Sequence, residues 1–296
     1  MALNRELFII IGMIRPRPNR WLLFLGFCFL IRLSVADWDT DKEGAIADKL
    51  SAQLEYGDII WLQTDKNSEF PAIYTLPVYN KKDRAVILLH GMSAHMDWPV
   101  VISPLRGFFR DRMWSSLSVQ LPVIATGKPP AEYSRTLDEA SRRIQSSIQY
   151  LKDQGYDTLV LAGYGFGATI AAFFLTNGHT RDIDAFVGIS MLARKFLAPQ
   201  VNLLDYLEKL SLPVLDIYGS NDLPVIIRTA DDRRLFAQKN GADRFSQIMI
   251  EGADHYYTGH VQTLFNDIIS WLQSLDSGEN KEQGNQAVQD GSTITY

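Results

Sequence analysis

Short apolar runs alternate with longer segments of helical periodicity along most of the chain. The runs are rich in β-branched residues, as buried strands are, whereas the segments between them place apolar residues three and four positions apart. Strands are predicted at 58–63, 72–78, 85–89, 116–121, 158–162, 185–189, 213–219 and 247–250. The first two are expected to form an antiparallel pair at the start of the sheet.

Helices are predicted between these strands. The clearest spans 136–154, where apolar residues recur on one face from Leu137 to Leu151 and Gly155 ends the pattern. Strands that alternate with helices favour a mostly parallel sheet covered by helices on both faces. The predicted fold class is therefore α/β, and ligands are expected beyond the carboxyl ends of the strands.

Residues 1–36 have the pattern of a secretory signal peptide. Three arginines within 15–20 precede an apolar run over 21–31, and a small-x-Ala site lies at 34–36. The run is shorter than the ~20 residues that span a bilayer. We expect cleavage after Ala36, export to the periplasm and no stable membrane span afterwards. An uncleaved anchor and a buried helix are the alternatives, and Met13 is an alternative start to Met1.

The rest of the chain fits one domain with two short flanking parts. The 296 residues are 46% hydrophobic, enough to bury a sizeable core, and α/β folds often exceed the usual single-domain length. We expect a leading helix within 37–55 and an α/β domain over 56–275. Residues 276–296 are rich in Gly, Ser, Asn, Gln and Glu, which predicts a disordered tail.

Charge and cysteine content narrow the function classes. The formal net charge is −5, and loss of 1–36 would remove five arginines and one glutamate, giving −9. An acidic mature chain argues against nucleic acid or an anionic membrane as partner. The single cysteine, Cys28, lies inside the signal peptide, so the mature chain would have neither a disulfide nor thiol chemistry.

A glycine-rich turn follows the predicted strand at 158–162. Gly163-Tyr164-Gly165-Phe166-Gly167 has the spacing of a nucleophile elbow, the G-x-S-x-G turn whose middle residue presents its hydroxyl to the substrate. Here the middle residue is Gly165, so no acyl-enzyme is expected at this position. The motif is not a dinucleotide fingerprint, because its third glycine comes one residue early and no ribose-binding acid is assignable; no cofactor is predicted.

The other parts of a hydrolytic site follow in chain order. Asp222 comes after the strand at 213–219, and His255 comes after the strand at 247–250. Elbow, acid and histidine in this order are typical of α/β-hydrolases. In such a site the histidine accepts the nucleophile's proton and the acid orients the imidazole. Asp222 as the cap of a helix near Pro224 is the alternative.

An oxyanion site is predicted where the strand at 85–89 ends in His90-Gly91. Backbone N–H groups at Met92, after this pair, and at Phe166, after the elbow glycine, are the expected donors. Ser93 on the same loop and Ser190 after the strand at 185–189 are candidates for a displaced nucleophile, although neither has an elbow-like context.

The loop continues as His95-Met96-Asp97-Trp98-Pro99, which places polar and aromatic groups at the rim of the predicted site. His90, His95, Asp97 and Trp98 are therefore candidate ligand-binding residues. The alternative is that Asp97 caps a helix near Pro99 while Trp98 packs against it. A metal site is not favoured, because these spacings lack a helical face and no second ligand cluster is present.

These motifs carry a family resemblance. From 56 to 275 the chain resembles an α/β-hydrolase, through His90-Gly91, the elbow at 163–167, Asp222 and His255 in that order. The segments 90–99 and 163–168 are similar to an uncharacterised bacterial hydrolase-like family, a domain of unknown function. The resemblance implies the α/β-hydrolase fold, but it brings no established reaction.

The expected function is that of an exported pseudo-hydrolase, which binds a small or envelope-derived ligand or another envelope protein without covalent catalysis. Two alternatives stay open. The first is an active ester or acyl hydrolase in which His255 and Asp222 activate water or a displaced serine. The second is a lyase-like proton transfer by the same pair. The substrate and the oligomeric state cannot be deduced from the sequence.

Overall fold

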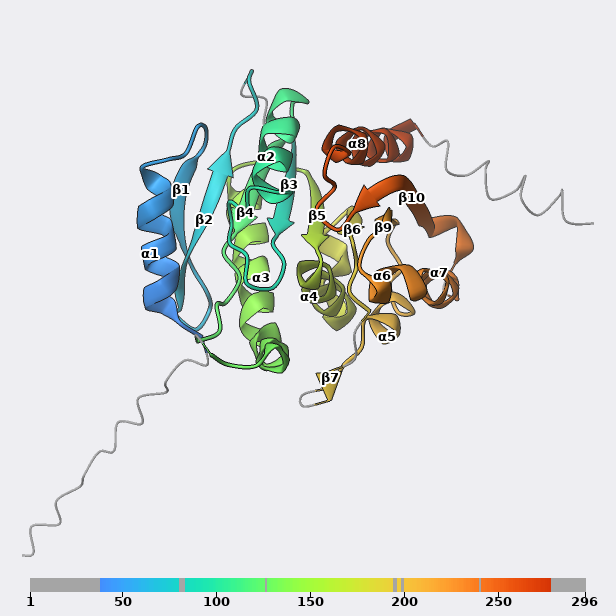
Figure 1. Cartoon of the computed structure of the whole chain (residues 1–296). Coiled ribbons are helices and arrows are strands. Elements are labelled where there is room, and N and C mark those ends of the chain that lie inside the picture. Colours follow the sequence, from blue (N-terminus) through green and yellow to red (C-terminus); the bar gives the residue numbers. More distant parts are fainter. Residues whose placement is uncertain are drawn as a thin grey trace, which may run out of the picture. The chain divides into compact units, whose positions relative to one another are not determined.

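A computed structural model describes residues 38–79, 83–125, 127–193, 196–197, 200–239 and 241–277 (Figure 1). The predicted signal peptide lies outside the described residues, and so does the predicted tail except for Asp276 and Ser277. Within the described part, no helix combines the length and apolar character needed to cross a membrane.

The centre of the fold is an eight-stranded sheet with the order β1-β2-β4-β3-β5-β6-β9-β10 (Figure 1). Pairing is antiparallel between β1 and β2 and between β2 and β4, and parallel across the rest of the sheet. The strands are β1 Asp58–Gln63, β2 Glu69–Thr75, β3 Arg84–Leu89, β4 Ser115–Val119, β5 Thr158–Tyr164, β6 Ala185–Ile189, β9 Val214–Asn221 and β10 Phe245–Asp254. The predicted α/β class with a mostly parallel sheet is confirmed.

The second strand differs in position from its prediction at 72–78. A turn at Asn67, whose φ is +60°, lets Glu69 pair with Gln63, so β2 begins earlier in the chain. Pro71 lies within the strand opposite Trp61, and β2 ends at Thr75, before Pro77. The antiparallel opening pair is confirmed, with its register shifted towards the amino end.

Helices cover both faces of the sheet because the central strands are apolar on both sides. In β3, Ala85, Ile87 and Leu89 pack with α3 and α4, whereas Val86 and Leu88 pack with α2 and α8. This alternation follows from the two-residue period of a strand. The helices are α1 Thr40–Ser51, α2 Ile102–Asp111, α3 Leu137–Asp153, α4 Phe166–Phe174, α5 Leu203–Leu207, α6 Pro224–Arg228, α7 Ala230–Gln238 and α8 Val261–Ser277. Short 3₁₀ turns lie at Pro130–Thr136, Thr180–Asp182 and Ala242–Arg244, a π turn at Leu175–His179, and a small hairpin pairs β7 Phe196–Leu197 with β8 Gln200–Val201.

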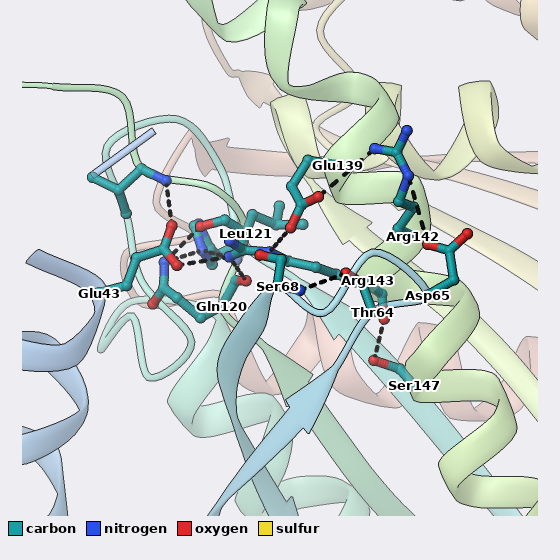
Figure 2. A network of polar contacts seen from close by, with 12 residues as sticks. Glu43, Thr64, Asp65, Ser68, Gln120, Leu121, Glu139, Arg142, Arg143 and Ser147 are labelled. Carbon is teal, nitrogen blue, oxygen red and sulfur yellow. Dashed lines mark hydrogen bonds and ion pairs between the residues drawn. The ribbon is translucent and has the colours of Figure 1, made fainter. Parts of the chain in front are cut away.

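A buried ion-pair network joins α1 to the core (Figure 2). Arg143 of α3 is fully buried, with Nη1 2.9 Å from Glu43 Oε2 and Nε 3.3 Å from Glu139 Oε1. Burial raises the pKa of Glu43 above its usual value, and the charge of Arg143 offsets only part of this effect. A charge buried at this depth requires its partner, so the network fixes where α1 can dock.

The same network orders the loop that follows β4. Val123 donates its N–H to Glu43 Oε1 at 2.9 Å, and Arg143 Nη1 donates to the Gln120 carbonyl at 2.8 Å. The Gln120 side chain in turn lies 3.0 Å from His90 Nε2 (Figure 2 shows Gln120 beside Glu43). The helix α1 therefore supports the loops after β3 and β4.

Candidate active site

The loops after the parallel strands converge at one edge of the sheet. β3, β5, β6, β9 and β10 are successive neighbours, so the residues after them lie side by side. These positions hold Gly91, Gly165, Ser190, Asp222 and His255. The structure therefore brings together the elbow, the acid, the histidine and the oxyanion loop that the sequence predicts, although they are far apart along the chain.

Gly165 occupies the sharp turn between β5 and α4. Its φ is +57° and its ψ is −117°, a combination that side-chain-bearing residues rarely adopt. A Cβ at Gly165 would meet only Gly91 Cα, at 3.9 Å, whereas a Cβ at Gly163 would lie 2.5 Å from Ala168 N and one at Gly167 2.5 Å from the His90 carbonyl. Close packing thus requires the two flanking glycines, while the space beside Gly165 is open.

His255 and Asp222 form a hydrogen-bonded pair. His255 Nδ1 lies 2.7 Å from Asp222 Oδ1, and their side chains are 19% and 0% exposed. With Nδ1 donating to the carboxylate, Nε2 is the nitrogen left to act on a ligand, and no residue in the described part bonds it. The imidazole is therefore oriented as a general base requires.

The second carboxylate oxygen of Asp222 is also satisfied. Ser190 Oγ donates to Asp222 Oδ2 at 2.5 Å, and the Tyr257 hydroxyl lies 2.9 Å from Ser190 Oγ. Burial disfavours ionisation of Asp222, but hydrogen bonds from His255 and Ser190 outweigh it, so the pKa of Asp222 lies below its usual value. Asp222 is held as a carboxylate.

Asp222 does not cap a helix, which was the alternative interpretation of this residue. Leu223, not Asp222, immediately precedes α6, and no side chain caps this helix. Asp222 Oδ1 does accept the N–H of Leu223 at 2.7 Å, in addition to the bond from His255. The carboxylate therefore serves the histidine, and its backbone contact fixes it in place.

Neither candidate for a displaced nucleophile bonds His255 in the described structure. Ser190 points to the far oxygen of Asp222, and its hydroxyl is buried. Ser93 N–H donates to the Tyr133 hydroxyl at 2.9 Å, and Ser93 Oγ lies 3.4 Å from the same oxygen. Both hydroxyls are engaged away from the imidazole, so neither Ser93 nor Ser190 stands against His255 as a nucleophile would.

A cavity of about 230 Å³ opens above Gly165. We call it the elbow cavity. Of the predicted site residues, Gly91, Met92, Trp98, Gly165, Phe166 and His255 line it. Sequence reasoning missed its remaining lining residues, which are mostly apolar: Ala94, Tyr164, Leu192, Leu223, Ile226 and Tyr256. The cavity suits a small ligand with limited polarity.

Tyr164 is the missed residue with the most direct contact to the base. Its ring stacks on that of His255 with centroids 5.2 Å apart and an interplanar angle of 29°. Its hydroxyl donates to the His255 carbonyl at 3.0 Å. Tyr164 therefore restrains both the ring and the backbone of His255, and its place just before the elbow glycine was the only sequence signal of this role.

Three predicted ligand-binding residues lie outside the elbow cavity. His90 is buried, accepts the N–H of Leu121 through Nε2 at 3.0 Å, and bonds the Gly91 carbonyl through Nδ1 at 2.8 Å. Burial lowers the pKa of His90 to about 3, so it stays neutral. His95 and Asp97 line other hollows, on the side of the loop facing α1.

Asp97 forms an ion pair instead of capping a helix. Its Oδ1 lies 2.7 Å from Arg106 Nη2, and the Arg106 side chain is buried. The helix α2 begins at Ile102, later than the predicted start near Pro99, and no side chain caps it. Asp97 thus ties the loop after β3 to α2, because a buried guanidinium requires a carboxylate partner.

Met92 and Phe166, whose backbone N–H groups the sequence predicts as oxyanion donors, both lie with Gly165 in the cavity lining. Met92 N–H has no hydrogen-bond partner in the described part of the chain, and Phe166 is the first residue of α4. Both residues line the elbow cavity, on the oxyanion loop and directly after Gly165. Among the described residues, no group of three or more His, Cys, Asp or Glu could hold a metal ion.

Replacing Ser190 by alanine should raise the pKa of Asp222. The substitution removes one hydrogen bond that favours the carboxylate and should lower the free energy of unfolding by about 2 kcal/mol. A depressed folded-state pKa adds stability above the unfolded pKa, and this stability is lost as the pH falls through the folded pKa. In Ser190→Ala this loss should be smaller and complete at a higher pH, because the folded-state pKa lies closer to the unfolded one. NMR titration of the Asp222 carboxyl carbon measures the raised pKa.

Ser93→Ala is the matched control, because Ser93 and Ser190 share a positive φ, of +58° and +50°. The hydroxyl of Ser93 does not touch Asp222, so the Asp222 titration should not move in this variant. An unchanged Asp222 titration in Ser190→Ala would show that Ser190 does not stabilise the carboxylate.

A mostly parallel sheet with these loops at its carboxyl edge defines an α/β-hydrolase-like protein, and solved structures agree. Est1E from Butyrivibrio proteoclasticus superposes with a TM-score of 0.61 at 15% identity, covering 75% of this chain and 99% of that one. The esterase Pf2001 from Pyrococcus furiosus superposes with a TM-score of 0.59 at 16% sequence identity, covering 81% of this chain and 94% of the esterase. The dienelactone hydrolase from Anabaena variabilis superposes with a TM-score of 0.58 at 15% sequence identity, covering 73% of this chain and 96% of the hydrolase.

The chain belongs to the protein family of unknown function DUF3530, whose sequence profile matches residues 35–142 and 129–274. None of the curated proteins compared matches this sequence. The resemblance to an α/β-hydrolase-like family of unknown function is therefore confirmed. At 14–19% identity, the solved structures establish the fold and leave the reaction open.

Proposed function

We propose that the protein binds a small, uncharged ester- or acyl-containing molecule in the elbow cavity without forming an acyl-enzyme. The observation that carries the proposal is the state of Gly165, which keeps the elbow conformation but has no side chain to attack a carbonyl. Covalent catalysis needs a hydroxyl against the histidine, and both nearby serines bond elsewhere. The site then recognises its ligand without attacking it covalently.

The lining of the cavity supports a ligand of low polarity. Trp98, Phe166 and Leu192 contribute apolar surface, and Leu223 and Tyr256 are 44% and 53% exposed at its edge. Met92 and Phe166 also line the cavity, and in this proposal their backbone N–H groups bond a carbonyl oxygen of the ligand. The solved relatives include esterases and Est1E with ferulic acid bound, which is in line with acyl-type ligands. Export by the leader-like segment 1–36 would make the cell envelope the source of the ligand.

A second candidate function is hydrolysis by activated water, and the contact between His255 and Asp222 favours it. The Nδ1 of His255 is held at 2.7 Å from the carboxylate, and Nε2 has no partner within the described chain. Water in the open space beside Gly165 could transfer a proton to Nε2 as it attacks a bound ester. The products would be the free acid and alcohol, with no covalent intermediate.

The two candidates are separated by one set of assays. We expect a neutral ester analogue, 2-heptanone, to bind the wild-type protein and to bind about tenfold more weakly to Trp98→Ala, because an apolar wall is lost. A fluorophosphonate, which labels an activated serine, should leave the mass of the protein unchanged. Calorimetry and mass spectrometry provide these measurements.

Hydrolysis of p-nitrophenyl acetate decides whether water activation accompanies binding. Turnover that disappears in His255→Ala would establish the second candidate, whereas binding without turnover would leave ligand recognition alone. Labelling by the fluorophosphonate would contradict both, since it requires a nucleophilic serine. Failure of 2-heptanone and of the ester to bind would also reject the proposed ligand class.

A further inference from the structure

A second cavity is lined by the same loop after β3 that lines the elbow cavity. Its volume is about 340 Å³, and we call it the lysine cavity. Its walls come from α1, from the loop after β3, from the loop after β4 and from Tyr133. Nothing in the proposed function uses this space.

Two lysines give the cavity a local positive charge. Lys42 of α1 and Lys128 of the loop after β4 both line it, and no Asp or Glu is among its lining residues. Neither ammonium group forms an ion pair with a residue in the described ranges. The whole chain has a formal net charge of −5, whereas the residues that line this cavity carry positive charge and no negative charge.

The other polar groups in the cavity can donate hydrogen bonds. His95 Nδ1 accepts the N–H of Asp97 at 3.2 Å, which leaves the proton of the neutral ring on Nε2. Burial lowers the pKa of His95, so the neutral form is favoured at pH 7. Ser93 also lines the cavity, and its hydroxyl lies 3.4 Å from that of Tyr133.

The remaining wall of the cavity is apolar, and a hydrogen bond to the buried Glu43 holds part of it in place. Ile46, Val123, Ile124 and Tyr133 supply this surface, and three of the four are buried. The buried carboxylate of Glu43 holds the N–H of Val123, so the loop after β4 is part of the ion-pair network of Figure 2. Lysines over a fixed apolar wall match an anionic group with a hydrocarbon remainder.

We propose that the lysine cavity binds the carboxylate or phosphate group of a small amphiphilic molecule, with Lys42 and Lys128 as the charged contacts. Ammonium groups bind both kinds of oxyanion through charge-assisted hydrogen bonds. The apolar part of the ligand would pack on Ile124 and Tyr133. The site is separate from the elbow cavity, and its existence does not depend on the function proposed there.

The two cavities nevertheless share a wall. Ala94 lines both, and the Tyr133 ring meets the Phe166 ring edge-on with centroids 6.0 Å apart. An anion in the lysine cavity would therefore contact the loop whose Met92 lines the elbow cavity.

The test compares hexanoate and hexyl phosphate with neutral 1-hexanol by isothermal titration calorimetry on the same protein. We expect at least one anion to bind, and its affinity to fall about fivefold in each of Lys42→Gln and Lys128→Gln. Any binding of 1-hexanol, which the elbow cavity can admit, should be the same in these variants as in the wild type. The two anions decide between carboxylate and phosphate. Both lysines are exposed, so the variants should fold.

Lys49→Gln is the matched control, because Lys49 is also an exposed lysine of α1 but lines a different hollow. Affinity in this variant and in Leu223→Ala, which alters the elbow cavity at a residue that does not line the lysine cavity, should equal that of the wild type. Equal losses of affinity for hexanol and for the anions in the two lysine variants, or an equal loss in Lys49→Gln, would overturn the proposal. An affinity that falls in Leu223→Ala but not in the lysine variants would place the anion in the elbow cavity and overturn the proposal as well.

Discussion

Gly165→Ser should create esterase activity, raising kcat/KM for p-nitrophenyl acetate at least about 100-fold above the wild-type value. The turn already has the conformation of a nucleophile elbow, with φ of +57°. The space for Cβ is open, since the nearest atom is Gly91 Cα at 3.9 Å. His255 is oriented by Asp222 to accept the proton of the new hydroxyl. Steady-state hydrolysis is the measurement.

The Gly165→Ala variant distinguishes the effect of the serine hydroxyl from the effect of backbone strain at this position. Any residue other than glycine in this conformation should cost about 1–3 kcal/mol of unfolding free energy, so both variants should lose similar stability. Only the serine variant should gain turnover, and His255→Ala introduced into it should remove the gain. A well-folded Gly165→Ser protein without hydrolysis would mean that the histidine and the amides are not placed for chemistry.

Arg143→Met should produce the largest loss of stability, about 3–5 kcal/mol of unfolding free energy. Arg143 is fully buried between Glu43 and Glu139, and its removal leaves two carboxylates without their common partner. A loss of this size corresponds to a melting temperature roughly 10 °C lower. Chemical denaturation and calorimetry measure it.

Arg142→Met is the control from the next position in the same helix. The Arg142 side chain is 27% exposed, and its contacts to Asp65 and Glu139 are 3.6 and 3.7 Å long. Such a pair contributes less than about 1 kcal/mol because water screens it. Equal losses in the two variants would show that burial of Arg143 is not what makes its ion pairs important.

Most of the fold could be predicted from the sequence because strand and helix periods differ clearly in this chain. β1, β3 and β6 lie where their apolar runs predict them, to within one residue. The misplaced element is β2, whose position depends on the turn at Asn67 and on pairing across it. Strand pairing joins residues that are distant in the sequence, so the local pattern of apolar residues does not predict it.

The grouping of the elbow, Asp222 and His255 was also predictable, since their order is a feature of the sequence. The groups that support them were not. Ser190, Tyr257 and Tyr164 act through bonds that span many residues, such as the contact between Ser190 and Asp222, which are 32 positions apart. Glu43 is an acidic residue in an amphipathic helix, where exposure is the usual expectation, and only the tertiary structure buries it against Arg143.

Trp98 gives the protein a built-in optical reporter. Its indole lines the elbow cavity, and its ring meets that of His95 edge-on with centroids 5.7 Å apart, while His95 lines the lysine cavity. The emission of an indole depends on the polarity around it and on quenching by nearby imidazoles. The chain has six tryptophans, so the difference spectrum between the wild type and Trp98→Phe isolates this one. Occupancy of either cavity can thus be followed by fluorescence, without a labelled ligand.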